Sequence, residues 1–264
     1  MVAESVPLAE KSRTTIAWRE KLVASAIHFL VTLALAAGAA ALIFLIWFPD
    51  PFHTMVGGTK LFLLIVGCDL ALGPLISLVI YNSKKPRKEL ITDYTIVGFV
   101  QLAALVYGVY SISNARPAYV AFSQDRLEIV TAVEIEESEL QAASDPYRSL
   151  PKWGPQFVAT DVPPDQQQDA LFVALQGRDI SMRPRFYVPY EHRIEEIKRR
   201  AKPLAELERR HPSAKELVAS ALAERGVPSD RVRWLPIKAK EGFWTALIDP
   251  ESGYPIAYVP LDPY

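Results

Sequence analysis

Three long apolar segments dominate residues 1–115. Leu22–Phe48 carries no formal charge over about 27 residues, which is enough to cross a bilayer core of about 30 Å with some tilt. Leu61–Tyr81 spans about 21 residues with one charge, Asp69, and Tyr94–Ser113 spans about 20 residues with none. The pattern predicts three transmembrane helices followed by a separate domain.

Basic residues lie on alternate sides of these segments. One cluster precedes the first segment and a second separates the second segment from the third, whereas the loop between the first and second segments carries only Lys60. Because lysine and arginine concentrate on the cytoplasmic side of bilayers, we expect a cytoplasmic segment at 1–21, a membrane domain at 22–115 and a periplasmic domain at 116–264. The two clusters are Lys11, Arg13, Arg19 and Lys21, and Lys84, Lys85, Arg87 and Lys88.

Segment 116–264 mixes strand and helix patterns. Strand-like alternation predicts a hairpin over Ala118–Val133 and closing strands over Val232–Ile237, Phe243–Ile248 and Tyr254–Val259. Helical periodicity predicts helices over Asp169–Gln176, Glu191–Ala201 and Ala214–Arg225. Proline, aspartate and glutamine enrich Ser144–Gln168, which predicts a loop. Helices between terminal hairpins indicate an α+β domain with an antiparallel sheet.

Charge and cysteine content narrow the function classes. The formal net charge is −1, so there is no electrostatic argument for nucleic acid as a partner. The single cysteine, Cys68, lies inside the second apolar segment, so the exported domain is expected to fold without disulfides. The first apolar segment is too long for a cleaved signal peptide and is expected to be a signal anchor.

Asp69 is the residue that most needs a physical explanation. An ionised carboxylate inside a bilayer costs about 2.5–3.5 kcal/mol, so it should be protonated, paired or turned toward polar neighbours. Tyr107 falls at a similar depth on the third segment and is the first candidate partner, and Gly73-Pro74 should bend the second helix. We expect these four residues to contact a membrane helix, either within the bundle or on a partner. A third alternative, after contacts within the bundle and contacts with a partner, is that Asp69 takes part in proton or ion transport.

Small residues on the three segments offer surfaces for close helix packing. Gly38, Gly67, Gly98 and Gly108 could let neighbouring helices approach without a hydrophobic driving force. The alternative is that alanine and glycine are simply common in such helices.

The spacing of the candidate residues predicts no enzyme active site, no cofactor site and no metal site. The sequence has no H-x-x-x-H, no C-x-x-C, no G-x-S-x-G and no glycine-rich phosphate loop. The acidic run from Glu134 to Glu139 is expected to be a solvated surface rather than a cation site. The rings of Trp153, Trp234 and Trp244 are expected to pack in a core.

The apolar half nevertheless resembles a known family. Trp47-Phe48-Pro49, Gly57-Gly58, the stretch Leu63–Leu75 with its G-x-D, the stretch Gln101–Tyr110 and Ala115-Arg116-Pro117 together resemble the TfpX/TfpZ (FimB-like) type IV pilin accessory proteins. The resemblance covers roughly residues 22–126, and the closing Tyr258–Tyr264 is similar too.

The resemblance implies a multi-pass protein of the bacterial inner membrane without catalytic residues. Such a protein would assist or modulate assembly of a cognate type IV pilin by binding its subunit in the membrane and the periplasm. Pilus assembly platform proteins and membrane lipids are further expected partners. The alternatives are a membrane-anchored sensor or ligand-binding protein with a periplasmic domain, and an envelope enzyme with an unrecognised site.

Overall fold

The computed structural model describes the backbone of residues 8–223 and 225–264, with side chains from Trp18 onward. The chain divides into two compact units. The first combines the residues up to Ile43 with Thr59–Ile112, and the second combines Phe44–Gly58 with Ser113–Tyr264. Part of the segment expected at 1–21 therefore lies outside the described residues, and its cytoplasmic placement stays a prediction.

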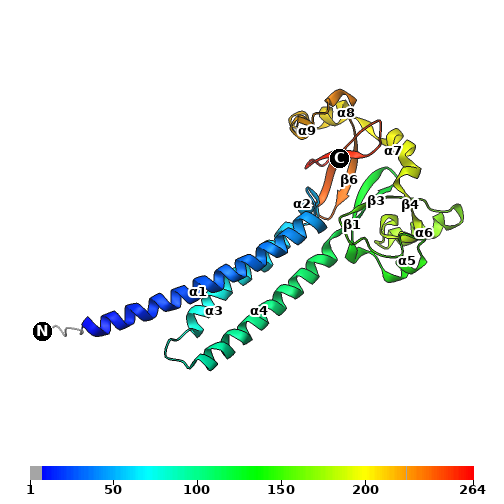
Figure 1. Ribbon diagram of the computed structural model, residues 1–264. Helices are drawn as coiled ribbons and strands as arrows, with labels where there is room; N and C mark the ends of the chain where they lie inside the picture. The colour runs from blue at the N-terminus through cyan, green and yellow to red at the C-terminus, as the bar shows by residue number, and fades with distance from the viewer. Residues whose placement is uncertain (1–7, 224) are drawn as a thin grey trace. The chain divides into compact units, whose positions relative to one another are not determined.

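The first unit is built from three long helices, which confirms the helices predicted over the three apolar segments (Figure 1). Three stretches are long and apolar enough to cross a membrane: Trp18–Trp47, Gly58–Ile80 and Arg87–Ala115. Each extends beyond its most apolar part because charged residues at the ends still continue the helical backbone. The helices are α1 (Leu8–Leu42), continued by a π-helical turn at Ile43–Trp47, α3 (Gly58–Ile80) and α4 (Arg87–Ala115).

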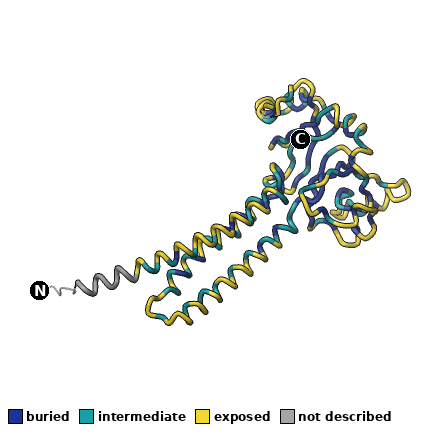
Figure 2. The backbone as a smooth tube through the Cα atoms, in the orientation of Figure 1, coloured by how far each residue is buried: buried dark blue, intermediate teal, exposed yellow. Residues whose placement is uncertain are grey.

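The surfaces of these helices are largely open. In the most apolar 18-residue stretch of each span, only 11–17% is buried. Figure 2 shows the long helices mainly in the colours of exposed and intermediate residues. Large apolar side chains such as Leu63, Phe99 and Val106 are exposed. Apolar residues all round a helix are typical of a segment that faces lipid or other membrane helices.

The second unit contains an eight-stranded sheet with the order β4-β3-β1-β2-β6-β7-β8, and β5 pairs with β6. Phe44–Gly58 belongs to this unit, so it takes in the end of the first expected span and most of the loop expected at Pro49–Lys60. The Phe52 and Tyr258 rings lie 5.5 Å apart, and Glu241 N–H donates to Met55 O at 3.2 Å. The strands are β1 (Pro117–Ser123), β2 (Arg126–Thr131), β3 (Gln156–Thr160), β4 (Tyr187–Pro189), β5 (Lys202–Pro203), β6 (Arg233–Ala239), β7 (Gly242–Ile248) and β8 (Pro255–Val259).

The sheet is mixed, so the expectation of an antiparallel sheet is wrong in this respect. The predicted hairpins β1–β2 and β7–β8 are antiparallel, but β1 pairs with β3 and β2 pairs with β6 in parallel. A hairpin can be recognised from the sequence because a short turn joins its two strands. Parallel strands are joined by long crossover connections, which leave no local sequence pattern. The strand β3 also lies inside Ser144–Gln168, which was expected to be loop.

Helices cover the sheet and complete two apolar cores. One core gathers residues of β1, β2, β3, β4 and α5, and the other gathers residues of α8, α9 and β6–β8. Trp234 lies in the second core as expected, and its indole N–H donates to Pro203 O at 3.0 Å. The helices of this unit are α2 (Phe52–Met55), α5 (Glu137–Ala142), α6 (Gln167–Leu175), α7 (Ile194–Arg200), α8 (Leu204–Arg210) and α9 (Ala214–Ala223).

Candidate functional site in the membrane helices

A cavity of about 110 Å³ lies between α1, α3 and α4. Most of its wall is apolar, as expected for helices of this composition. Four polar side chains interrupt that wall: His28 and Thr32 from α1, Asp69 from α3 and Gln101 from α4, and the Thr32 hydroxyl already donates to His28 O at 3.0 Å. The lining residues are His28, Val31, Thr32, Leu35, Ala36, Val66, Asp69, Gly98, Gln101, Leu102 and Leu105.

The polar groups of the cavity are only partly satisfied. His28 Nε2–H donates to Gln101 Oε1 at 2.7 Å, since the amide oxygen can only accept. His28 Nδ1 and Gln101 Nε2 remain buried with no hydrogen-bond partner among the described residues. Asp69 has no hydrogen-bond or ion-pair partner among the side chains described from Trp18 onward. His28 and Gln101 thus line the cavity with side chains whose hydrogen-bonding capacity is only partly used, and Asp69 lines it with an unpaired carboxyl group.

Gly73 and Pro74 lie where α3 meets the other two helices. A Cβ placed at Gly73 would lie 2.8 Å from Gln101 Nε2 and 3.2 Å from His28 Nε2, too close for a side chain without displacement. The Ser25 hydroxyl donates to Pro74 O at 3.0 Å, and α3 continues through Pro74. The absence of a side chain at Gly73 is what lets the His28–Gln101 pair form beside α3.

The other small residues divide into two groups. Gly108 contacts α3 closely, because a Cβ there would lie 2.7 Å from the Ile65 side chain. At Gly38, Gly67 and Gly98 a Cβ would meet no described atom within 4 Å. Gly108 thus acts as a close-approach position inside the bundle, and the other three glycines leave open surface.

Tyr107 does not line this cavity. Its side chain is 71% exposed, and no hydrogen bond joins it to Asp69 in the described part of the chain. Depth along a helix was the basis for choosing Tyr107, but six residues separate it from Gln101, about 240° around the helix axis. Counting depth from the sequence puts His28 and Gln101 nearer the cytoplasmic side than Asp69, so depth did not select them. Their signal was available: each is a polar residue within an apolar helix.

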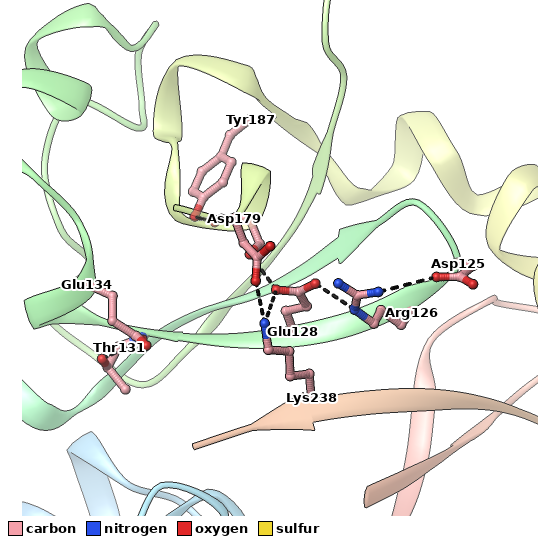
Figure 3. Close-up of polar contacts among 9 residues, drawn as sticks. Asp125, Arg126, Glu128, Thr131, Glu134, Asp179, Tyr187 and Lys238 are labelled. Atoms are coloured by element: carbon pink, nitrogen blue, oxygen red, sulfur yellow. Dashed lines mark hydrogen bonds and ion pairs between the residues drawn. The ribbon is translucent and has the colours of Figure 1, made fainter. Parts of the chain in front are cut away.

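The second unit handles its buried charges differently. Glu128 on β2 is 5% exposed and accepts from Arg126 Nε at 2.7 Å and from the Ser181 hydroxyl at 2.6 Å. Lys238 Nζ lies 3.9 Å from the same carboxylate and also pairs with Asp179, so Glu128 points between two cations (Figure 3). Every oxygen of Glu128 is satisfied, which is typical of a structural ion network.

Part of the acidic run is structural too, so the expectation of a solvated surface is wrong for it. Glu139 is 6% exposed and accepts from Arg183 Nε at 3.1 Å and from Arg185 Nε at 2.5 Å. Glu134 accepts from both the backbone N–H and the hydroxyl of Thr131 at 2.7 Å. Among the described residues there is no group of histidine, cysteine, aspartate and glutamate side chains that could hold a metal ion.

Sequence comparisons place the chain among proteins of fimbrial assembly. Residues 16–57 match the profile of the family described as "Fimbrial assembly protein FimB", a stretch that includes His28. No solved structure matches the chain.

The curated relatives extend this match along the chain. The serogroup I fimbrial assembly protein of Dichelobacter nodosus is 34% identical over 229 residues, covering 85% of this chain and 89% of the relative. The serogroup E1 protein is 33% identical over the same shares of both chains. A shorter fimbrial assembly protein of serogroups C1 and C2 is 43% identical over 119 residues, 91% of its own length. The two longer relatives therefore match both the apolar half and most of the residues after it, and the chain belongs to the family of fimbrial assembly proteins.

Proposed function

We propose that this protein is an inner-membrane accessory factor for fimbrial assembly that binds a pilin subunit through its membrane helices. The two longer relatives are fimbrial assembly proteins, which supports fimbrial assembly as the process in which this protein acts. The cavity supports the mode of action, because Asp69, His28 and Gln101 present unsatisfied polar groups inside an apolar bundle. Such groups are costly in a bilayer and mark contact or transport sites.

A pilin-like subunit waiting in the membrane has an apolar helix and a head outside the bilayer. A polar group on that helix could enter the cavity and bond to the three unsatisfied side chains. In the orientation that the basic clusters favour, the sheet unit would lie in the periplasm and could contact the head. Two linked contacts raise the effective concentration of each, so moderate individual affinities would suffice. This role requires no catalytic residue, cofactor or metal.

The observation that carries the proposal is that Asp69 has no partner among the side chains that the structure describes, and Asp69→Leu tests the proposal. In a deletion strain complemented with this variant, the protein should accumulate in the membrane. Surface fimbriae should fall at least about tenfold, the effect of about 1.4 kcal/mol of lost binding. Cys68→Leu is the matched control, since it introduces the same side chain at the neighbouring exposed position.

Photocrosslinking identifies what enters the cavity. A photoreactive residue at Leu102, which lines the cavity, should capture a pilin-like single-span chain from native membranes, and Asp69→Leu should reduce that capture. Capture of only assembly-platform proteins would indicate that the protein acts on the pilus assembly platform rather than on the pilin. If the variant accumulates, still captures the pilin and yet abolishes fimbriae, the protein acts after binding and the binding role of Asp69 is wrong.

A further inference from the structure

We propose that the loop Pro151–Gly154 anchors the sheet unit to the bilayer surface by placing Trp153 among the phospholipid headgroups. Trp153 was expected in a core, but its side chain is 70% exposed. Trp234 is buried and Trp244 is half-buried, so Trp153 is exceptional among the tryptophans of this unit. An indole combines a large apolar ring with one N–H donor, the combination that favours the membrane–water interface.

The loop is held against the end of the first membrane-spanning stretch. Gly154 N–H donates to Ile46 O at 3.0 Å, and Ile46 lies in the last turn of the apolar stretch Trp18–Trp47. Leu45, next to it, is 77% exposed, as a lipid-facing side chain would be. Gly154 adopts a φ of +49°, a left-handed conformation that glycine accommodates without strain. A residue one position from this contact lies within reach of the layer where the span leaves the bilayer.

The exit of the third span holds the same loop. Arg116 follows directly after α4, and its guanidinium donates to Ser113 O at 2.5 Å and to Pro151 O at 3.1 Å. Burial lowers the pKa of Arg116 from its usual value, in keeping with its enclosed position. The Tyr119 hydroxyl donates to Ser149 O at 3.3 Å. Bonds to Ile46, in the last turn of the first span, and to Arg116, directly after the third span, therefore hold the loop on both sides of Trp153.

Charge supports lipid as the occupant of this exposed ring. Lys152 is exposed beside Trp153, and an ammonium group next to an interfacial aromatic ring can bind lipid phosphate. The bond from Gly154 to Ile46, the neighbour of the exposed apolar Leu45, supports the same occupant. A protein partner at Trp153 is the competing possibility, and the experiment below separates the two.

Depth-dependent fluorescence quenching tests the proposal in the full-length protein. The protein is reconstituted into phosphatidylcholine vesicles whose acyl chains are brominated either near the glycerol or near the chain end. A background with Trp18→Phe and Trp47→Phe leaves Trp153, Trp234 and Trp244 as emitters. We expect the shallow bromines to quench this background more than the deep ones, and Trp153→Phe to remove more than about half of the shallow quenching. Trp244→Phe, the matched control, should leave it unchanged.

Two results would overturn the assignment. One is a background that no brominated lipid quenches, or whose quenching survives Trp153→Phe. The other is a Trp153 that is unquenched in vesicles while a photoreactive residue at position 153 captures a protein in cells. If the double background does not insert, wild type and Trp153→Phe are compared directly, and equal shallow quenching of the two contradicts the proposal.

Discussion

Asp69 in the helical unit and Glu139 in the sheet unit are both carboxylates held away from bulk water, but their surroundings differ. Glu139 accepts hydrogen bonds from two arginines and is 6% exposed. Asp69 lines a cavity together with His28 and Gln101, whose Nδ1 and Nε2 atoms are buried without partners in the described part of the chain. The buried carboxylates of the sheet unit are paired with cations, although Arg183 Nη1 and His211 Nε2 are also buried without a described partner. In the helical unit the carboxyl group itself, that of Asp69, has no partner among the described side chains.

The difference teaches how to separate structural from functional charge in this protein. A buried carboxylate with several cationic donors is part of the fold, and removing it leaves its partners uncompensated. A carboxylate without a partner in an apolar bundle destabilises the isolated protein, so it must be retained for another reason. Opposite signs of the effect on stability are therefore expected for the two residues.

The largest expected effect is that of Glu139→Ala. The substitution leaves Arg183, 7% exposed at its side chain, without its counter-charge and should lower the free energy of unfolding by about 3–5 kcal/mol. Thermal unfolding of the purified protein, followed by near-UV circular dichroism, measures this. Glu137→Ala, at an exposed position of the same helix, should change it by less than about 0.5 kcal/mol.

Asp69→Leu should act in the opposite direction. Replacing an unpaired carboxyl group by an apolar side chain in a membrane helix should stabilise the isolated protein by up to about 3 kcal/mol. Resistance to unfolding by sodium dodecyl sulfate, followed by far-UV circular dichroism, reports the change. Destabilisation would mean that Asp69 has a partner inside the bundle and that the contrast with Glu139 is false. Asp69→Asn then tells whether charge or hydrogen bonding matters for fimbriae.

Gly73→Leu tests whether the cavity depends on close helix approach. The new side chain would displace the His28–Gln101 pair, and overpacking of this kind costs about 1–3 kcal/mol. The same detergent titration measures it. Gly67→Leu is the control on the same helix, because a Cβ at Gly67 meets no described atom within 4 Å. Equal effects of both variants would show that Gly73 has no special packing role.

The smallest expected effect is a pH-dependent one in the sheet unit. The Tyr254 hydroxyl donates to Glu191 Oε1 at 2.5 Å, and this bond lowers the pKa of Glu191 below its usual 4.5. Burial, and then the same bond, raises the pKa of Tyr254 to about 12, so Tyr254 stays protonated at neutral pH. Because the folded pKa of Glu191 is lowered, its contribution to stability is present above the usual value and is lost as the pH falls through the lowered one.

Tyr254→Phe should therefore lower the melting temperature slightly near pH 7, and this deficit should shrink as the pH falls through the lowered pKa of Glu191. Glu191→Gln provides the control, since its melting temperature should not show this component of the pH dependence. A deficit of Tyr254→Phe that persists at low pH would assign the effect to packing against Phe157 and Tyr190 instead.

Much of the fold follows from local pattern. The apolar lengths predicted three helices, and alternation predicted the hairpins β1–β2 and β7–β8, as the structure confirms. The predicted helix over Asp169–Gln176 corresponds to α6. The site was predicted less well: Asp69, Gly73 and Pro74 lie at or beside the cavity, but Tyr107 does not line it. The depth of a residue in the membrane can be counted from the sequence, whereas the side of each helix that faces its neighbours cannot.

The sequence by itself determined the membrane helices, the local hairpins and the family resemblance, because each depends on residues close together in the chain. Tertiary structure alone decided that β1–β3 and β2–β6 pair in parallel, that two arginines enclose Glu139 and that Trp153 is left exposed. It also decided that Asp69 shares a cavity with His28 and Gln101. These features depend on contacts between residues far apart in the chain, and no local periodicity encodes such contacts.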